Sequence, residues 1–227
     1  MTRRIVAAAV VVLFGLIFAR LAANYVELDA LRSLARFYVV EGPAELGAPN
    51  IVTGILISYR GFDTLGEVAV LFMVAASVGL LLKQDGVLGH AAPRRVASEI
   101  VRTGTAVLLP LIFTFGAYVI VNGHLSAGGG FQGGAIGASG VMVRLLAGAG
   151  ATLNVALLSI VESFAGVFYV LLGILGLVLA GGFLDPRFMP KGEFGAFISA
   201  GAIPLISALL GIKVGAELSV IIDRFRN

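Results

Sequence analysis

Several ionisable side chains stand inside apolar stretches, where a charge costs at least ~2.5–3.5 kcal/mol on insertion scales. Glu67 follows Asp63 by four residues, with Arg60 just before, and an uncharged run over residues 68–82 follows it. These three charges could form an interfacial cluster that reaches out to water. Alternatively, Glu67 could handle protons or cations in a water-lined passage. The long uncharged run after Glu67 favours the second interpretation.

A second group of charges lies near the carboxyl end. Lys213 and Glu217 are four residues apart in an apolar helix, so their side chains meet on one helical face. They could be a neutralising ion pair or a contact to a partner chain, or a relay pair whose proton affinities are coupled. Glu162 lies near a predicted helix start, where the helix dipole favours an anion. Capping, partner contact and transport all remain open for Glu162.

The third candidate is a polar loop between two apolar runs. It contains His124, which could be solvated or hydrogen-bonded to backbone, or could sense protons. It also contains six glycines, five of which are Gly128, Gly129, Gly130, Gly133 and Gly134. No strand precedes them and no P-loop lysine follows, so they do not form a nucleotide loop. We expect a tight chain reversal that partner chains cover, because non-helical backbone at membrane depth needs protein or water around it.

Composition sets the class of protein. Hydrophobic residues make up 59% of the 227 residues, charged residues only 13%, and mean hydropathy is +1.02. Soluble domains have about 25% charged residues, so this is an integral membrane protein. The absence of cysteine excludes thiolate-held iron–sulfur clusters, disulfides and cysteine zinc sites. His90 and His124 fall in different loops, which argues against haem. We expect no metal and no cofactor.

The hydropathy pattern predicts an all-α membrane protein with about six transmembrane helices. The expected helices cover about residues 5–21, 63–82, 103–121, 131–146, 155–179 and 194–222, with Pro110 and Pro204 inside two of them. The first run has the basic start of a signal peptide, but no clean cleavage site ends it, so we expect the helix to be retained. A short amphipathic interfacial helix is expected within residues 22–49.

Positive charges predict the orientation. Six spans place both chain ends on one side of the membrane. That side holds nine basic residues, which are Arg3, Arg4, Lys83, Arg94, Arg95, Arg102, Arg144, Arg224 and Arg226. The other side holds six, which are Arg20, Arg32, Arg36, Arg60, Arg187 and Lys191. The positive-inside rule therefore predicts that both termini are cytoplasmic.

Two stretches resemble known families. Residues 50–56 and 59–67 read NIVTGIL and YRGFDTLGE. They resemble the signature of the E subunit of membrane-bound hydrogenases and the matching carboxyl-terminal part of the Mrp antiporter A subunit. Residues 123–134 read GHLSAGGGFQGG and resemble the hallmark of the Mrp antiporter B subunit, with Ala127 at a position that is usually proline. The resemblance implies an E-like segment over residues 1–99, with two spans, and a B-like segment over 100–227, with four.

The resemblance implies a non-catalytic membrane subunit of a large Mrp-type complex that exchanges a monovalent cation, Na⁺, for H⁺ across a prokaryotic cell membrane. The complex could be a plain antiporter or could belong to a respiratory, hydrogenase-type assembly. Its partners would be the lipid bilayer and the other membrane subunits. Matched to the E-type motif, Asp63 and Glu67 are the best candidates for the ion path. The alternative is a structural subunit that docks the antiporter-like and redox modules.

Overall fold

The computed structural model describes residues 2–26, 29–84, 97–148 and 151–226. Within these ranges the protein is helical and contains no β-strand, only one isolated bridge between Gly192 and Ser199. The all-α prediction is confirmed. The chain forms two compact units, Met1–Arg36 and Phe37–Asn227. The first unit holds α1 (Thr2–Ala23), whose large apolar side chains are exposed. This exposure suits a helix that contacts lipid.

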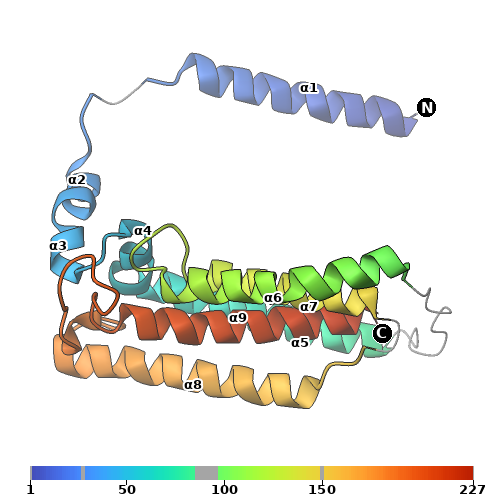
Figure 1. Ribbon diagram of the computed structural model, residues 1–227. Coiled ribbons are helices and arrows are strands. Elements are labelled where there is room, and N and C mark those ends of the chain that lie inside the picture. The colour runs from blue at the N-terminus through green and yellow to red at the C-terminus, as the bar shows by residue number, and fades with distance from the viewer. Residues whose placement is uncertain (1, 27–28, 85–96, 149–150, 227) are drawn as a thin grey trace. The chain divides into compact units, whose positions relative to one another are not determined.

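The second unit begins with short helices and continues with long ones (Figure 1). A short helix, α2 (Ser33–Val40), crosses the division between the units. The elements that follow are α3 (Gly42–Leu46), α4 (Ile51–Gly54), the π-helical turn η1 (Ile55–Tyr59), α5 (Gly61–Gln84), α6 (Glu99–Val121), α7 (Gly130–Ala147), α8 (Val155–Ala180), the 3₁₀ turn η3 (Pro186–Phe188) and α9 (Ile203–Arg226).

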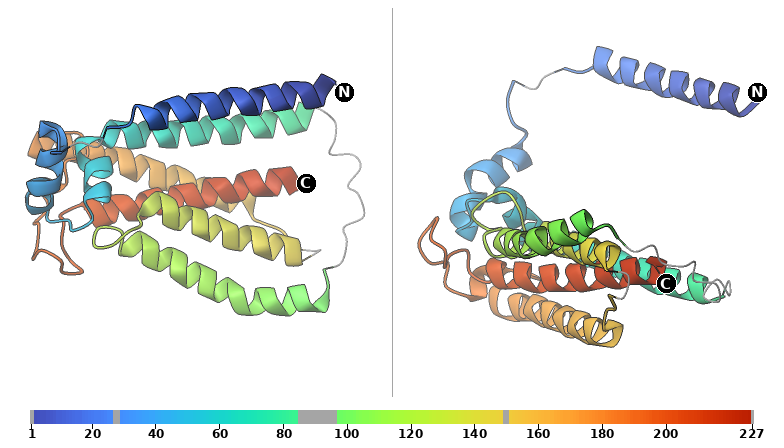
Figure 2. Two further views of the ribbon diagram at one scale, coloured as in Figure 1. Left: turned by 90° about the horizontal axis from the view of Figure 1, so that it is seen from above. Right: turned by 45° about the vertical axis from the view of Figure 1, so that its right-hand side comes forward.

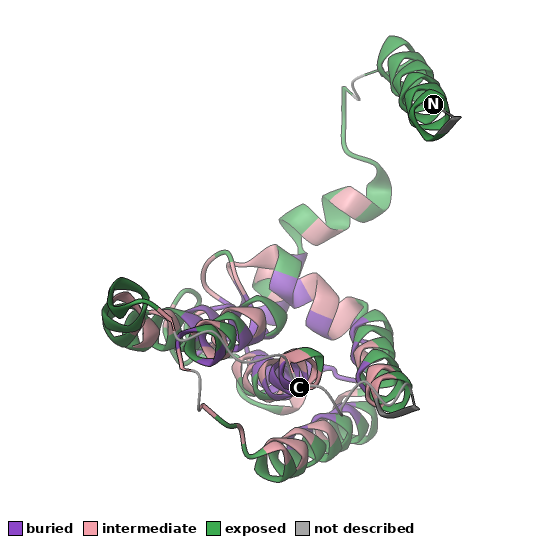
Figure 3. Ribbon diagram, turned by 90° about the vertical axis from the view of Figure 1, so that its right-hand side faces the viewer, coloured by how far each residue is buried: buried purple, intermediate pink, exposed green. Residues whose placement is uncertain are grey.

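The centre of the second unit is α9. It packs against α5, α6, α7 and α8, and the view along the bundle shows these helices around it (Figure 3). Of its most apolar span, 56% is buried, against 22% or less for α5, α6 and α8. The outer helices therefore turn large apolar faces away from the bundle. Such faces are what lipid or neighbouring membrane subunits cover.

Among the described residues, five helices are long and apolar enough to span a membrane, namely α1, α5, α6, α8 and α9. The sixth predicted span is α7, which runs beside α6 and α9 (Figure 2) but is not one of the five. Its 18 residues include several glycines, Gln132 and Arg144, which lower its hydropathy. Most of the residues that this helix buries are glycine or alanine, so its lower hydropathy accompanies close packing within the bundle.

Two further expectations differ from the structure in detail. The last helix begins at Ile203, whereas we expected it from about residue 194. Pro204 therefore lies in its first turn, where the missing N–H breaks no helical hydrogen bond. Pro110 does lie inside α6, as predicted. The basic loop that carries Arg94 and Arg95, and His90 with it, lies outside the described residues.

Glycines bring the backbone of α7 against its neighbours. A Cβ atom at Gly134 would lie 2.6 Å from the carbonyl oxygen of Gly211 in α9, and one at Gly133 would lie 2.7 Å from that of Gly116 in α6. A Cβ atom at Gly130 would overlap the carbonyl oxygen of Ser207. Small residues allow this approach, as they commonly do between membrane helices. The start of α7 is thus fixed against α9.

Adding one methyl group tests this contact. We expect Gly134→Ala to destabilise the fold by about 1–3 kcal/mol, because the methyl has no room against α9. The matched control is Gly137→Ala on the same helix, where a Cβ meets nothing within 4 Å. Thermal unfolding of the detergent-solubilised protein measures both. Equal unfolding midpoints for the two variants would contradict the close α7–α9 contact.

Candidate functional site

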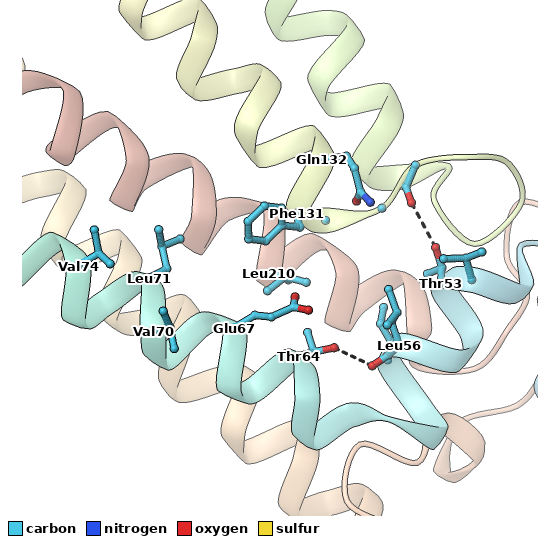
Figure 4. Close-up of a pocket in the computed structure, with 15 residues that line it drawn as sticks. Thr53, Leu56, Thr64, Glu67, Val70, Leu71, Val74, Phe131, Gln132 and Leu210 are labelled. Carbon is cyan, nitrogen blue, oxygen red and sulfur yellow. Dashed lines mark hydrogen bonds between the residues drawn. The ribbon is translucent and has the colours of Figure 1, made fainter. Parts of the chain in front are cut away.

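A cavity of about 690 Å³ lies where the two sequence motifs meet (Figure 4). Its walls come from α4 with η1, from α5, from the glycine loop with the start of α7, and from Leu210 of α9. Most of the lining is apolar. The polar side chains in it are Thr53, Thr64, Glu67 and Gln132.

Asn50 joins the two motifs. Its side-chain oxygen caps α4 by accepting hydrogen bonds from the amides of Val52 and Thr53, at 3.2 and 3.3 Å. Its side-chain nitrogen donates to the carbonyl oxygens of Gly123 and Ser126, at 2.7 and 2.6 Å. One amide group therefore starts a helix and holds the loop that faces it.

Two threonines complete the polar framework of the cavity. The Thr53 hydroxyl donates to the carbonyl oxygen of Gly128 at 3.3 Å. The Thr64 hydroxyl donates to the carbonyl oxygen of Leu56 at 2.7 Å. Leu56 belongs to η1, and a π-helical turn leaves carbonyl groups without their usual α-helical partners. These bonds tie the wall of α4 and η1 to the loop on one side and to α5 on the other.

Glu67 is the acidic side chain of the cavity wall. In Figure 4 its carboxyl group points from α5 into the cavity, toward Leu210. Among the described residues it has no hydrogen bond or ion pair. Asp63, one turn earlier, does not line the cavity and is paired with Arg60. The two carboxylates of the motif thus have different surroundings, and Glu67 is the one available to a ligand.

Three charged side chains meet elsewhere in the unit, between α8 and α9. The Lys213 ammonium lies 2.9 Å from Glu162 Oε1 and 3.4 Å from Glu217 Oε2. Lys213 is 7% exposed and Glu217 is fully buried. The i,i+4 spacing pointed to the Lys213–Glu217 contact, but the contribution of Glu162 from another helix could not be read from spacing.

His124 is buried rather than solvated, with 1% of its surface exposed. Its Nε2 atom lies 3.1 Å from the carbonyl oxygen of Phe197, in the loop before α9. Burial lowers the pKa of His124 below its usual value of 6.5, because the charged imidazolium loses water. Its geometry therefore favours a neutral ring that links two loops.

The structure brings together some of the predicted site residues and separates others. Glu67 shares the cavity with Gly128, Gly129 and Gly130, whereas Gly133 and Gly134 face the neighbouring helices of α7. Four polar residues of the site, Asn50, Thr53, Thr64 and Gln132, are not among the residues predicted from the sequence. The first three stand within the E-type motif and the fourth within the B-type motif. Membership of a motif was therefore the feature of the sequence that could have identified them.

Comparisons with known families agree with the two motifs. Residues 100–220 match the family described as a domain related to the MnhB subunit of Na⁺/H⁺ antiporters. Residues 2–85 match the family described as the E subunit of MBH. These two matches together cover most of the chain.

The chain is also similar to chains of solved structures and to curated proteins. A chain in the structure of the membrane-bound sulfane sulfur reductase, an archaeal respiratory membrane complex, is 34% identical, with a TM-score of 0.84 and coverage of 99% of this chain and 98% of that one. A chain of the Mrp complex from Dietzia sp. is 25% identical, with a TM-score of 0.77, and this chain spans 26% of it.

An uncharacterised protein of Methanocaldococcus jannaschii is 29% identical over 84% of each chain. A probable A/B subunit of a K⁺/H⁺ antiporter from Rhizobium meliloti is 28% identical over 51% of this chain and 14% of its own length.

The buried histidine predicts a pH-dependent stability. A histidine whose pKa is depressed in the folded state binds fewer protons there than in the unfolded chain. Stability is therefore retained above about pH 6.5 and lost as pH falls below it, by up to about 1.4 kcal/mol per pH unit of depression. We expect His124→Gln to flatten this dependence. Thermal unfolding at about pH 8 and about pH 5 measures it, and identical slopes in both proteins would contradict the prediction.

Proposed function

This chain belongs to the family of domains related to the MnhB subunit of Na⁺/H⁺ antiporters, and we propose that it forms part of the ion path of a cation/proton antiporter module. It is a multi-pass membrane protein in which a segment like the E subunit of MBH is fused to an MnhB-like segment. The exchanged ions would be Na⁺ and H⁺. The chain would carry no catalytic centre, and other membrane subunits would surround it.

The observation that carries the proposal is the carboxylate of Glu67, which has no ion pair among the described residues and lies on the wall of a cavity that both motifs line. An ionisable group without a partner is costly inside a membrane, so it persists where water or an ion satisfies it. Oxygen atoms of Glu67, Thr53, Thr64 and Gln132 are available around the cavity. Oxygen ligands suit hard cations such as Na⁺. A proton and a sodium ion would therefore compete for the same carboxylate.

Asp63 has a supporting part in this proposal. Its carboxylate forms an ion pair with the guanidinium of Arg60, which lies about two turns before Glu67. Without Asp63, that positive charge would be free to reach toward the cavity and repel a cation. Asp63 would thus keep the approach to Glu67 electrically favourable without lining the cavity itself.

The similarity over the whole chain to one chain of an archaeal respiratory complex supports a place in a respiratory assembly of that kind. In such an assembly, electron transfer in other subunits would drive the exchange. This chain would then contribute ion movement and no redox chemistry.

Replacing Glu67 by Gln tests the ion path. Loss of the charge should remove about 1.5–3 kcal/mol of interaction with the ion, which lowers Na⁺/H⁺ exchange by roughly tenfold to a hundredfold. Exchange is measured as Na⁺-dependent pH change in vesicles that contain the assembled complex. The matched control is Glu99→Gln, the same change at an exposed position in the first turn of α6, and it should leave exchange unchanged.

If Glu67→Gln exchanges at the wild-type rate while the complex stays assembled, the ion-path role is wrong. That result would instead support a purely structural subunit that docks the antiporter-like and redox modules. Repeating the measurement with K⁺ in place of Na⁺ identifies the cation, and faster exchange with K⁺ would overturn the assignment of Na⁺.

We further propose that both chain termini are cytoplasmic, as the distribution of basic residues favours. The chain has no cysteine, so single cysteines can report the side of the membrane. Glu193→Cys, in the loop before α9, should react with a membrane-impermeant maleimide on intact cells. Thr152→Cys, between α7 and α8, should react only after lysis. The reverse pattern would place both termini outside.

A further inference from the structure

The Glu162–Lys213–Glu217 cluster contains two carboxylates and one ammonium group. With all three ionised it would carry one uncompensated negative charge. Lys213 and Glu217 are almost completely buried, and the Glu162 side chain is only 13% exposed. An uncompensated charge in such surroundings costs several kcal/mol. Charge balance therefore requires one more positive charge in the cluster.

Among the residues that the structure describes, the neighbouring elements do not supply that charge. The charges that act on Glu217 are Lys213, on its own helix, and Glu162, on α8. From α5, the Phe72 ring faces the Lys213 ammonium, with 5.7 Å between Nζ and the ring centre. Glu67, also on α5, lines the cavity instead. Arg226, near the end of α9, is paired with Asp223.

The two carboxylates differ in their hydrogen bonds. Glu162 accepts a hydrogen bond from Lys213 Nζ at 2.9 Å. Glu217 is 3.4 Å from the same nitrogen, and neither of its oxygens has a hydrogen-bond partner within the described part of the chain. A buried carboxylate without hydrogen bonds is far more costly than a buried neutral acid. Glu217 is therefore the group that gains most from being protonated.

We propose that the cluster is a binding site for one exchangeable proton, held on Glu217 while Lys213 pairs with Glu162. If the ammonium shifts from Glu162 to Glu217, the O–H bond at Glu217 is lost and one forms at Glu162. The cluster keeps the same total charge in both arrangements. Gly166 leaves space for this shift, because the Lys213 stem lies across it on α8.

The ligand is a proton rather than a sodium ion. The Lys213 ammonium already lies against both carboxylates, where a metal ion would have to bind. Among the described residues, no group of three or more acidic or histidine side chains could hold a metal. The site is separate from the Glu67 cavity, so it does not depend on the proposed exchange of Na⁺ at that cavity.

Infrared spectroscopy of the assembled complex in membranes tests the charge count. The carbonyl stretch of a protonated carboxylic acid, recognised by its shift in D₂O, should be present at neutral pH in a difference spectrum of wild type minus variant. Either Glu217→Gln or Glu162→Gln should lose the band, because one ammonium and one carboxylate then balance. Lys213→Met should strengthen it, because both acids must then be neutral.

Each variant tests the charge of the cluster independently. If one variant complex fails to assemble, the spectra of the other variants still decide the question. Both Gln variants leave one ammonium and one carboxylate in balance, so the cluster stays neutral and both variants are expected to assemble. A band that survives both Gln replacements, or is unchanged in Lys213→Met, would overturn the proton site and leave a structural ion pair. Glu67→Gln should keep the band, so the two proposals can fail separately.

Discussion

Direct contact between the backbones of α7 and α9 is the constraint on which the second unit depends. Gly130 and Gly134 lie against the backbone of Ser207 and Gly211. α7 starts at this contact, and the glycine loop just before it lines the cavity. The same contact orients α9, which presents Leu210 to the cavity and Lys213 to α8. One packing surface therefore sets both the Glu67 cavity and the charged cluster.

The long elements of the fold could be predicted from sequence because lipid imposes a simple rule on them. An apolar run of sufficient length must be helical, so the helices near residues 63–82, 103–121 and 155–179 were placed closely. The start of α9 was misplaced because residues 194–202 are apolar without being helical. Apolar character identifies burial or lipid contact, but it does not reveal a loop that packs over the end of a bundle.

The site was predictable only where its chemistry is local in the chain. Glu67 stands out from its own neighbours, and Lys213 and Glu217 meet through helical spacing alone. The remaining contacts join distant residues. Glu162 approaches Lys213 across 51 positions, and Asn50 reaches Gly123 across 73. Such pairs depend on how the helices are arranged in space. The spacing of residues along a single sequence does not reveal that arrangement.

The Asn50 bridge also bears on why the two segments share one polypeptide. The segment before it and the loop it holds match two different families, yet one amide group satisfies both. On separate chains, this contact would form only after a bimolecular encounter. On one chain, its partners meet at an effective concentration set by the tether, which reaches the millimolar range for short flexible links. Covalent fusion thus turns an interface between chains into an intramolecular folding step, and it fixes the stoichiometry of the two segments at one to one.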